Sequence, residues 1–205
     1  MVFLGKVLIV LKTVLMMYIT LLPAIISGIL NMIWCKLPIL SSLKVPMDFK
    51  KKFRDGKRIF GDNKTWKGFI GYLILNTLCS IIWGFICKIG NFSHLNYFYV
   101  NNSNTILFNL FIGFLLGLGY SLFELPNSFL KRRLNIVEGK NPEGLKKIIF
   151  IFLDQADSVF GCCLVVWLFY NLGIKLYLLY VLLGAVTHIL VNMLLYFLHL
   201  RKNMF

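Results

Sequence analysis

The sequence predicts an all-α integral membrane protein with about five transmembrane helices in a single domain covering residues 1–205. Hydrophobic residues make up 59% of the 205 positions, whereas soluble domains carry about 45–50%. Only 15% of the residues are charged, yet the net charge is +14 because 22 Lys and Arg stand against 8 Asp and Glu. This composition excludes a soluble globular enzyme, a disordered tail and a disulfide scaffold.

Five apolar stretches approach the roughly 20 residues that a helix needs to cross the hydrocarbon core. They cover residues 13–34, 69–87, 106–123, 148–170 and 176–200. None of the connections between them reaches the roughly 50 residues of an independent domain. We therefore expect one polytopic membrane domain.

Basic residues gather in alternate connections and predict the orientation of the chain. Residues 36–67 hold ten Lys and Arg, residues 131–147 hold six, and Arg201 and Lys202 follow the last stretch. Short basic loops stay on the cytoplasmic side of a membrane. We therefore expect the N-terminus outside, the C-terminus in the cytoplasm, and a multi-pass protein of the cell membrane.

Asp154 and Asp157 are the most informative acids. Residues 158–172 would form only about 22 Å of helix, which is short of the roughly 30 Å core, so the helix must begin before Asp154. At a spacing of three residues the two carboxylates share one helix face, where they repel unless a proton or cation lies between them. Mg²⁺ is the natural occupant, and salt bridges to a neighbouring helix are the structural alternative.

Glu124 ends the third apolar stretch and directly precedes a helix-breaking sequence. Pro126 predicts that the helix kinks or restarts there. Asn127 or Ser128 could then cap a new turn whose free N–H groups favour an anion, and three basic residues follow one turn later. The structural alternative is an ordinary positively charged stop signal.

Residues 61–68 read Gly-Asp-Asn-Lys-Thr-Trp-Lys-Gly and stand immediately before the second apolar stretch. Lys64 and Lys67 suit a polyphosphate, Thr65 can donate to a phosphate oxygen, and Trp66 can stack on a base or anchor at the interface. The alternative is binding of anionic lipid headgroups, worth about 1 kcal/mol per basic residue.

Together these elements predict a metal-dependent phosphate site on catalytic cytoplasmic loops at about 36–67 and 124–147, with a second substrate arriving from the bilayer. Nucleotidyl transfer mainly requires positioning and neutralisation of charge. Polar residues elsewhere in the apolar stretches, namely Asn76, His188 and Asn192, are expected to hydrogen-bond between helices.

Three segments resemble the signatures of the CDP-archaeol synthases, which are CTP-dependent lipid cytidylyltransferases related to the phosphatidate cytidylyltransferases. They are residues 61–69, 128–136 and 153–158, and the resemblance runs in order along most of the chain. Phe123-Glu124 stands where the family pattern has Gly-Asp, and the His-Gly-Gly and Asp-Arg elements of the diacylglycerol branch are missing.

The resemblance implies that CTP and a lipid phosphate, such as 2,3-di-O-geranylgeranyl-glycerol 1-phosphate, give a CDP-lipid and pyrophosphate. A lipid phosphate oxygen would attack the α-phosphate of CTP in line, with Mg²⁺ as cofactor. The implied metal ligands are Glu124, Asp154 and Asp157; the other catalytic residues are Ser128, Lys131 and Arg132; and CTP binding is expected at Lys64, Thr65, Trp66 and Lys67.

Other functions remain open at this point. The lipid could be phosphatidate, giving CDP-diacylglycerol. A transporter using the paired acids as a proton relay would show inverted-repeat symmetry, which the sequence lacks, and a membrane protein that only binds anionic lipid would not turn over CTP. We expect CTP and a lipid phosphate as partners, with a homodimer as a further expectation, and no nucleic acid.

Overall fold

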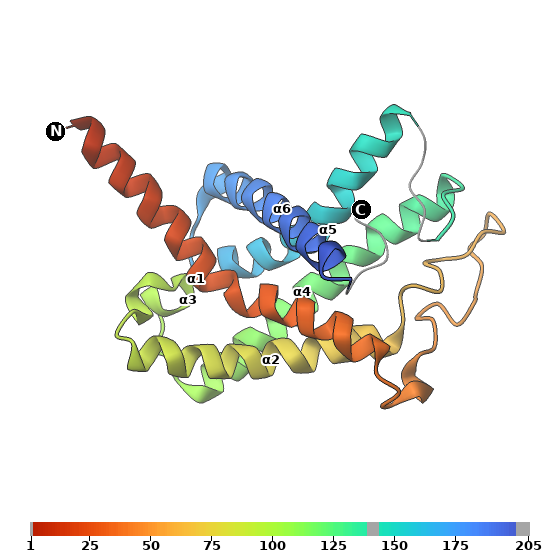
Figure 1. The fold of residues 1–205 in the computed structure, drawn as a ribbon, viewed down its shortest axis with the longest axis horizontal. Coiled ribbons are helices and arrows are strands. Elements are labelled where there is room, and N and C mark those ends of the chain that lie inside the picture. The colour runs from red at the N-terminus through yellow and green to blue at the C-terminus, as the bar shows by residue number, and fades with distance from the viewer. Residues whose placement is uncertain (1, 139–143, 200–205) are drawn as a thin grey trace.

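The computed structural model describes residues 2–138 and 144–199. Arg201, Lys202 and the centre of the second basic segment lie outside them. The described residues form helices and no β-sheet (Figure 1). The long helices are α1 (Val2–Lys36), α2 (Trp66–Ile89), α4 (Ile106–Arg133), α5 (Leu145–Phe169) and α6 (Gly173–Phe197), and α3 (Tyr97–Val100) is a single turn.

The five long helices confirm the predicted fold class, because all five are long and apolar enough to cross a membrane. Two of them extend well beyond their apolar stretches: α1 begins at Val2, and α4 continues to Arg133. Hydropathy marks only the part of a helix that suits hydrocarbon, whereas the backbone hydrogen bonds can continue into the interface. With 35 residues, α1 is about 52 Å long and its first turns project from the bundle (Figure 1).

The helices pack in a row that follows the chain. Helix α2 lies between α1 and α4, and α5 lies between α4 and α6. Helices α4 and α5 cross backbone against backbone, because a Cβ on Gly161 would come within 2.1 Å of the Gly119 carbonyl oxygen. Small residues at a crossing let helices approach this closely. The crossing lies about one turn from Glu124 and Asp157, so it brings the acids of the two helices together.

The predicted restart of the helix at Pro126 is wrong. Helix α4 continues through Pro126 to Arg133, so Asn127 and Ser128 are interior helical residues and cap nothing. A proline inside a helix costs about 3 kcal/mol, and contacts made by the following residues with α5 offset this cost. One consequence matters for the site: Glu124, Asn127 and Lys131, spaced by three and four residues, share one helix face.

The first basic segment, residues 37–65, folds around Asp48. The carboxylate of Asp48 accepts hydrogen bonds from the Arg58 guanidinium at 2.8 and 3.1 Å and from the backbone N–H groups of Lys50, Phe60 and Gly61 at 3.0–3.1 Å. Burial by itself raises the pKa of Asp48, but Arg58 and the three N–H donors outweigh burial and hold this pKa well below its usual range. The loop therefore has a defined structure with little regular secondary structure.

The two basic segments meet at the same end of the bundle (Figure 1). Lys57 Nζ donates to the Arg133 carbonyl oxygen at 2.7 Å, and the Arg133 side chain donates to the Arg58 carbonyl oxygen at 2.5 Å and pairs with Asp55 at 2.7 Å. The backbone N–H of Asp62 donates to Glu138 at 2.8 Å. The loop before α2 is thereby held against the end of α4. Which face of the membrane this end occupies stays a prediction.

Candidate active site

Charged and amide side chains from three segments converge at this end of the bundle. We call this group the acid cluster. It consists of Lys64 before α2, Glu124, Asn127 and Lys131 on α4, and Asp154 and Asp157 on α5. Because α4 is unbroken and crosses α5 at Gly119 and Gly161, residues far apart in the sequence face one another across this contact.

Asn127 joins the two acids of α5. Its Nδ2 donates to Asp154 Oδ1 at 2.7 Å and to Asp157 Oδ2 at 2.8 Å. The Oδ1 atom of Asn127 is buried without a hydrogen-bond partner. One carboxylate oxygen from each acid therefore points at a single atom, which confirms that the two acids share a helix face.

Two lysines supply positive charge to the cluster. Lys131 Nζ contacts Asp154 at 2.5 Å, and Lys64 Nζ forms an ion pair with Glu124. Burial lowers the pKa of Lys64, but the carboxylates of Glu124, Asp157 and Asp154 together raise it more, so its pKa lies above the usual value and the ammonium stays charged at neutral pH. With all three carboxylates ionised, the two ammonium groups leave one negative charge in excess, which a bound cation would balance.

The donor set fits Mg²⁺ only with help from a substrate. Among the described residues, no three His, Cys, Asp or Glu side chains come close enough together to hold a metal ion by themselves. The two oxygens that converge on Asn127 do match the one or two carboxylates that Mg²⁺ takes when water and phosphate oxygens complete its shell. The residues therefore fit a metal shared with a phosphate substrate.

A partly open cavity lies beside the acid cluster. Lys64, Thr65 and Glu124 line it on the charged side, and Gly28 and Tyr120 lie on its inner wall. It holds about 600 Å³ of empty space, counting its open mouth. We call it the polar cavity.

The predicted nucleotide-binding residues separate into two groups. Lys64 and Thr65 line the polar cavity, and the Thr65 hydroxyl also caps α2 by accepting from the Gly68 N–H at 3.2 Å. Trp66 and Lys67 point elsewhere. Lys67 is buried and donates to the Leu37 carbonyl oxygen at 2.5 Å. The structure therefore uses Lys67 to hold the end of α1.

Trp66 packs among aromatic rings, with ring centroids 5.9 Å from Phe69 and 6.3 Å from Phe49. Its indole N–H is buried without a partner. The predicted catalytic residues Ser128 and Arg132 also stand apart from the carboxylates. Ser128 makes no hydrogen bond with them, and Arg132 pairs with Glu138 at 3.6 Å.

Asn127 is the cluster member whose role the sequence analysis missed. The missed signal was its position: it follows Glu124 by three residues and precedes Lys131 by four, the spacing of a single helix face. Assuming a helix break at Pro126 hid that relation. Proline marks a local cost, and the partners on α5 that offset it are visible only in the folded chain.

Comparison with known sequences decides the family. The sequence model described as CarS-like, CDP-archaeol synthase, matches residues 6–205. The chain belongs to the CDP-archaeol synthase family. The CDP-archaeol synthase of Methanocaldococcus jannaschii is 30% identical over 74% of this chain and 78% of that relative, and the one of Pyrococcus abyssi is 36% identical over 56% of this chain and 61% of that relative.

The chain thus spans about 60% of the length of the Pyrococcus members that it matches. A solved structure of an intramembrane enzyme for archaeal membrane lipid biosynthesis has the same fold, with a TM-score of 0.57 and 22% identity over 86% of this chain and 92% of that chain. The fold and the family predicted from the three sequence motifs are both confirmed.

Proposed function

We propose that this protein is a membrane cytidylyltransferase that joins CTP to a lipid phosphate and releases pyrophosphate. The observation that carries the proposal is the pair of α5 carboxylates aimed at one point, beside two lysines and a partly open polar cavity. Membership in the CDP-archaeol synthase family favours an ether lipid phosphate of the 2,3-di-O-geranylgeranyl-glycerol 1-phosphate type. The location of the protein in the bilayer also suits a substrate that stays in the membrane.

Asp154 and Asp157 would hold Mg²⁺, with Glu124 as the third proposed ligand and water and phosphate oxygens completing the shell. Bound there, the ion would neutralise charge on the transferring phosphate and on the pyrophosphate leaving group. Glu124 would exchange its present partner Lys64 for this role. A glutamate reaches further than an aspartate, which suits an acid standing on a different helix from the other two.

The chain's own residues would neutralise and position the substrates. Lys64 and Lys131 now pair with carboxylates, and each carries a compact charge on a flexible stem that can turn towards the triphosphate. Arg132 and Ser128, on the same helix, are proposed to reach the lipid phosphate or the pyrophosphate. Thr65 would contact CTP at the rim of the polar cavity, while Trp66 and Lys67 would hold the loop that carries Lys64.

The bond changes place little demand on acid–base chemistry. An anionic oxygen of the lipid phosphate would form the new bond to the α-phosphorus of CTP as the bond to the pyrophosphate oxygen breaks. This nucleophile is already deprotonated at neutral pH, so the protein has chiefly to align it and to stabilise charge. Because CTP is a cytoplasmic substrate, the polar cavity would face the cytoplasm, in agreement with the basic loops around it.

The test is release of pyrophosphate by the purified protein with CTP, Mg²⁺ and a lipid phosphate. Asp157→Asn should lower kcat by on the order of a thousandfold, because the charge that faces the metal is lost while the size and shape of the side chain remain. Asp62→Asn is the control: Asp62 lies at the same end of the bundle with a side chain that is 58% exposed, and its loss should leave kcat nearly unchanged.

Dialkyl and diacyl glycerol phosphates should be compared side by side, and we expect the dialkyl substrate to have the higher kcat/KM. Full activity of Asp157→Asn would contradict the proposal that Asp157 is a metal ligand. If neither lipid supports pyrophosphate release by the unaltered protein, the proposed function is wrong.

A further inference from the structure

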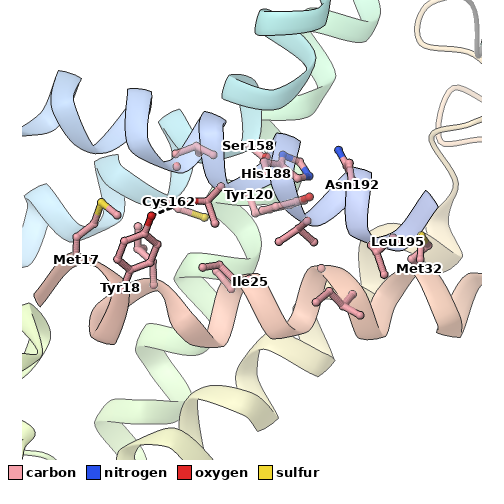
Figure 2. A pocket seen from close by; sticks show the side chains of 18 residues that line it. Met17, Tyr18, Ile25, Met32, Tyr120, Ser158, Cys162, His188, Asn192 and Leu195 are labelled. Atoms are coloured by element: carbon pink, nitrogen blue, oxygen red, sulfur yellow. Dashed lines mark hydrogen bonds between the residues drawn. The ribbon is translucent and has the colours of Figure 1, made fainter. Parts of the chain in front are cut away.

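A second cavity lies between α1 and α6 (Figure 2). We call it the apolar groove. It holds about 790 Å³ of empty space, counting its open side. Its walls are aliphatic and sulfur-containing side chains, among them Met17, Ile25, Met32, Val191 and Leu195.

Hydrogen bonds join α1 to α6 at one end of the groove. The hydroxyls of Tyr18 and Thr187 share a hydrogen bond of 2.9 Å, and the Tyr180 hydroxyl donates to the Thr13 carbonyl oxygen at 3.2 Å. Both bonds lie away from the acid cluster. Between those bonds and the end of α1 at Lys36, the groove opens between the two helices.

Two polar side chains that line the groove from α6 pair with α5. Asn192 Nδ2 donates to Gln155 Oε1 at 2.6 Å, and His188 Nδ1 lies 3.2 Å from the Gln155 carbonyl oxygen. These bonds tie α6 to the turn of α5 that carries the two acids. Tyr18 and Thr187 pair with each other, and the Ser158 Oγ atom is buried without a partner. The surface left for a ligand is therefore mainly, but not wholly, apolar.

The groove and the polar cavity share two lining residues, Gly28 and Tyr120. Ser158, the residue after Asp157, also lines the groove. The two spaces therefore meet beside the acid cluster, one apolar and one charged. Gly28 has open space around it, since a Cβ added there would meet no atom within 4 Å.

We propose that the apolar groove binds one hydrocarbon chain of the lipid phosphate, which enters sideways between α1 and α6 and presents its phosphate to the acid cluster past Gly28 and Tyr120. This inference rests on the proposed function and adds where its lipid substrate lies. An amphipathic phosphate matches the pair of spaces, because its chain stays in apolar surroundings while its anionic end reaches Lys64 and Lys131. A nucleotide or a sugar would leave its polar groups unpaired in the groove.

Gly28→Leu tests the junction between the two spaces, and Gly5→Leu is its matched control. Both glycines stand in α1 with no atom within 4 Å of an added Cβ, but only Gly28 lines the groove. Gly28→Leu should raise the KM for a long-chain dialkylglycerol phosphate by about tenfold or more. Gly5→Leu should leave that KM unchanged.

Val191→Phe narrows the groove from the α6 side at a residue that does not line the polar cavity. It should raise the KM for the long-chain lipid phosphate by about tenfold while leaving the KM for CTP unchanged. An analogue with six-carbon chains needs less of the groove, so its KM should change little in this variant.

The outcomes separate the two proposals. If the unaltered protein turns over CTP but neither variant changes the dependence on lipid chain length, the groove assignment is overturned and the proposed function stands. The groove assignment would also be overturned if the variants lost equal activity with long-chain and short-chain lipids, or if only the KM for CTP rose. Lower thermal stability without an effect of chain length would overturn it too, and would mean that the groove holds a structural lipid. No turnover of any lipid phosphate by the unaltered protein would overturn the proposed function itself.

Discussion

The two ends of the helix bundle are both rich in polar side chains, but they use them differently. At the end around α3, which we call the neutral end, uncharged groups bond to one another. Tyr99 donates to Asn109 Oδ1 at 2.7 Å, Asn109 Nδ2 donates to Asn104 Oδ1 at 2.8 Å, and Tyr97 shares a hydrogen bond of 2.5 Å with Tyr180. Both Asn109 and Tyr97 are buried.

The end that carries the acid cluster is less completely satisfied. Its side chains keep contact with solvent, with Asp154 26% and Glu124 24% exposed. Buried polar atoms without a partner remain on Asn127, Trp66 and Arg132. At the neutral end, by contrast, the side chains of Asn104 and Asn109 have no buried polar atom without a hydrogen-bond partner.

The difference teaches how polar residues divide their work in a membrane protein. A buried polar group that finds all its partners within the chain rigidifies the fold. A group that is left partly exposed, or short of a partner, retains capacity for a ligand. Substitutions at the neutral end should therefore lower stability, and substitutions at the acid cluster should lower activity.

The largest effect is expected at the acid cluster from Lys131→Met, which removes a charge and keeps the length of the side chain. The value of kcat/KM should fall about 10²- to 10³-fold, because Lys131 would no longer neutralise phosphate charge. The thermal unfolding midpoint should move little, since a partly exposed ion pair is worth at most about 1 kcal/mol. Steady-state kinetics and thermal unfolding of the same preparations check both statements.

Lys147→Met is the control for Lys131→Met, because Lys147 is exposed at the same end of the bundle. Equal losses in the two variants would mean that overall positive charge matters and that the contact with Asp154 does not. This result would contradict the expectation that the contacts of the acid cluster serve activity.

At the neutral end, Asn109→Leu should lower the free energy of unfolding by about 2 kcal/mol, because the partners on Tyr99 and Asn104, which are both partly buried, are left unpaired. Activity per folded molecule should stay unchanged. Denaturant unfolding combined with kinetics on the folded fraction measures both. Asn101→Leu, at an exposed position of the same end, is the control and should change the free energy of unfolding by no more than about 0.5 kcal/mol. If Asn109→Leu lost activity without losing stability, the assignment of the neutral end to stability would be contradicted.

The smallest effect concerns Asp48, a charged group that is fully satisfied within its loop. Because its folded pKa lies well below the usual range, Asp48 contributes stability at pH values above about 3.9, and this contribution is lost as the pH falls towards the folded pKa. Between pH 4 and pH 3 the loss should be about 1 kcal/mol. It should be absent in Asp48→Asn.

Unfolding free energies measured over this pH range, for both proteins, test the point. Parallel curves for the two would show that Asp48 is not held in its charged form by Arg58. A steeper fall of the unfolding free energy in the unaltered protein would sharpen the comparison between the two ends of the bundle. It would show that a polar group stabilises the fold when all its hydrogen-bond partners are present, whether or not the group is charged.

Local patterns in the sequence determined much of this protein. Apolar stretches of membrane-spanning length predicted all five long helices, and the three-residue spacing of Asp154 and Asp157 placed both on one face of α5. Three short motifs indicated the family that the matching sequence model then confirmed. Such features depend on hydropathy and on the helical repeat, which neighbouring residues set by themselves.

Only the tertiary structure decided which polar groups meet. Pro126 predicted a kink or a restart of the helix, yet α4 continues to Arg133 because contacts with α5 offset the local cost. Lys67 belongs to the same motif as Lys64, but the neighbouring end of α1 captures it. The close crossing at Gly119 and Gly161 aligns Asn127 with the acids, and the separation of α1 from α6 leaves the groove. Each outcome depends on a contact between segments distant in the chain, and no local pattern encodes that contact.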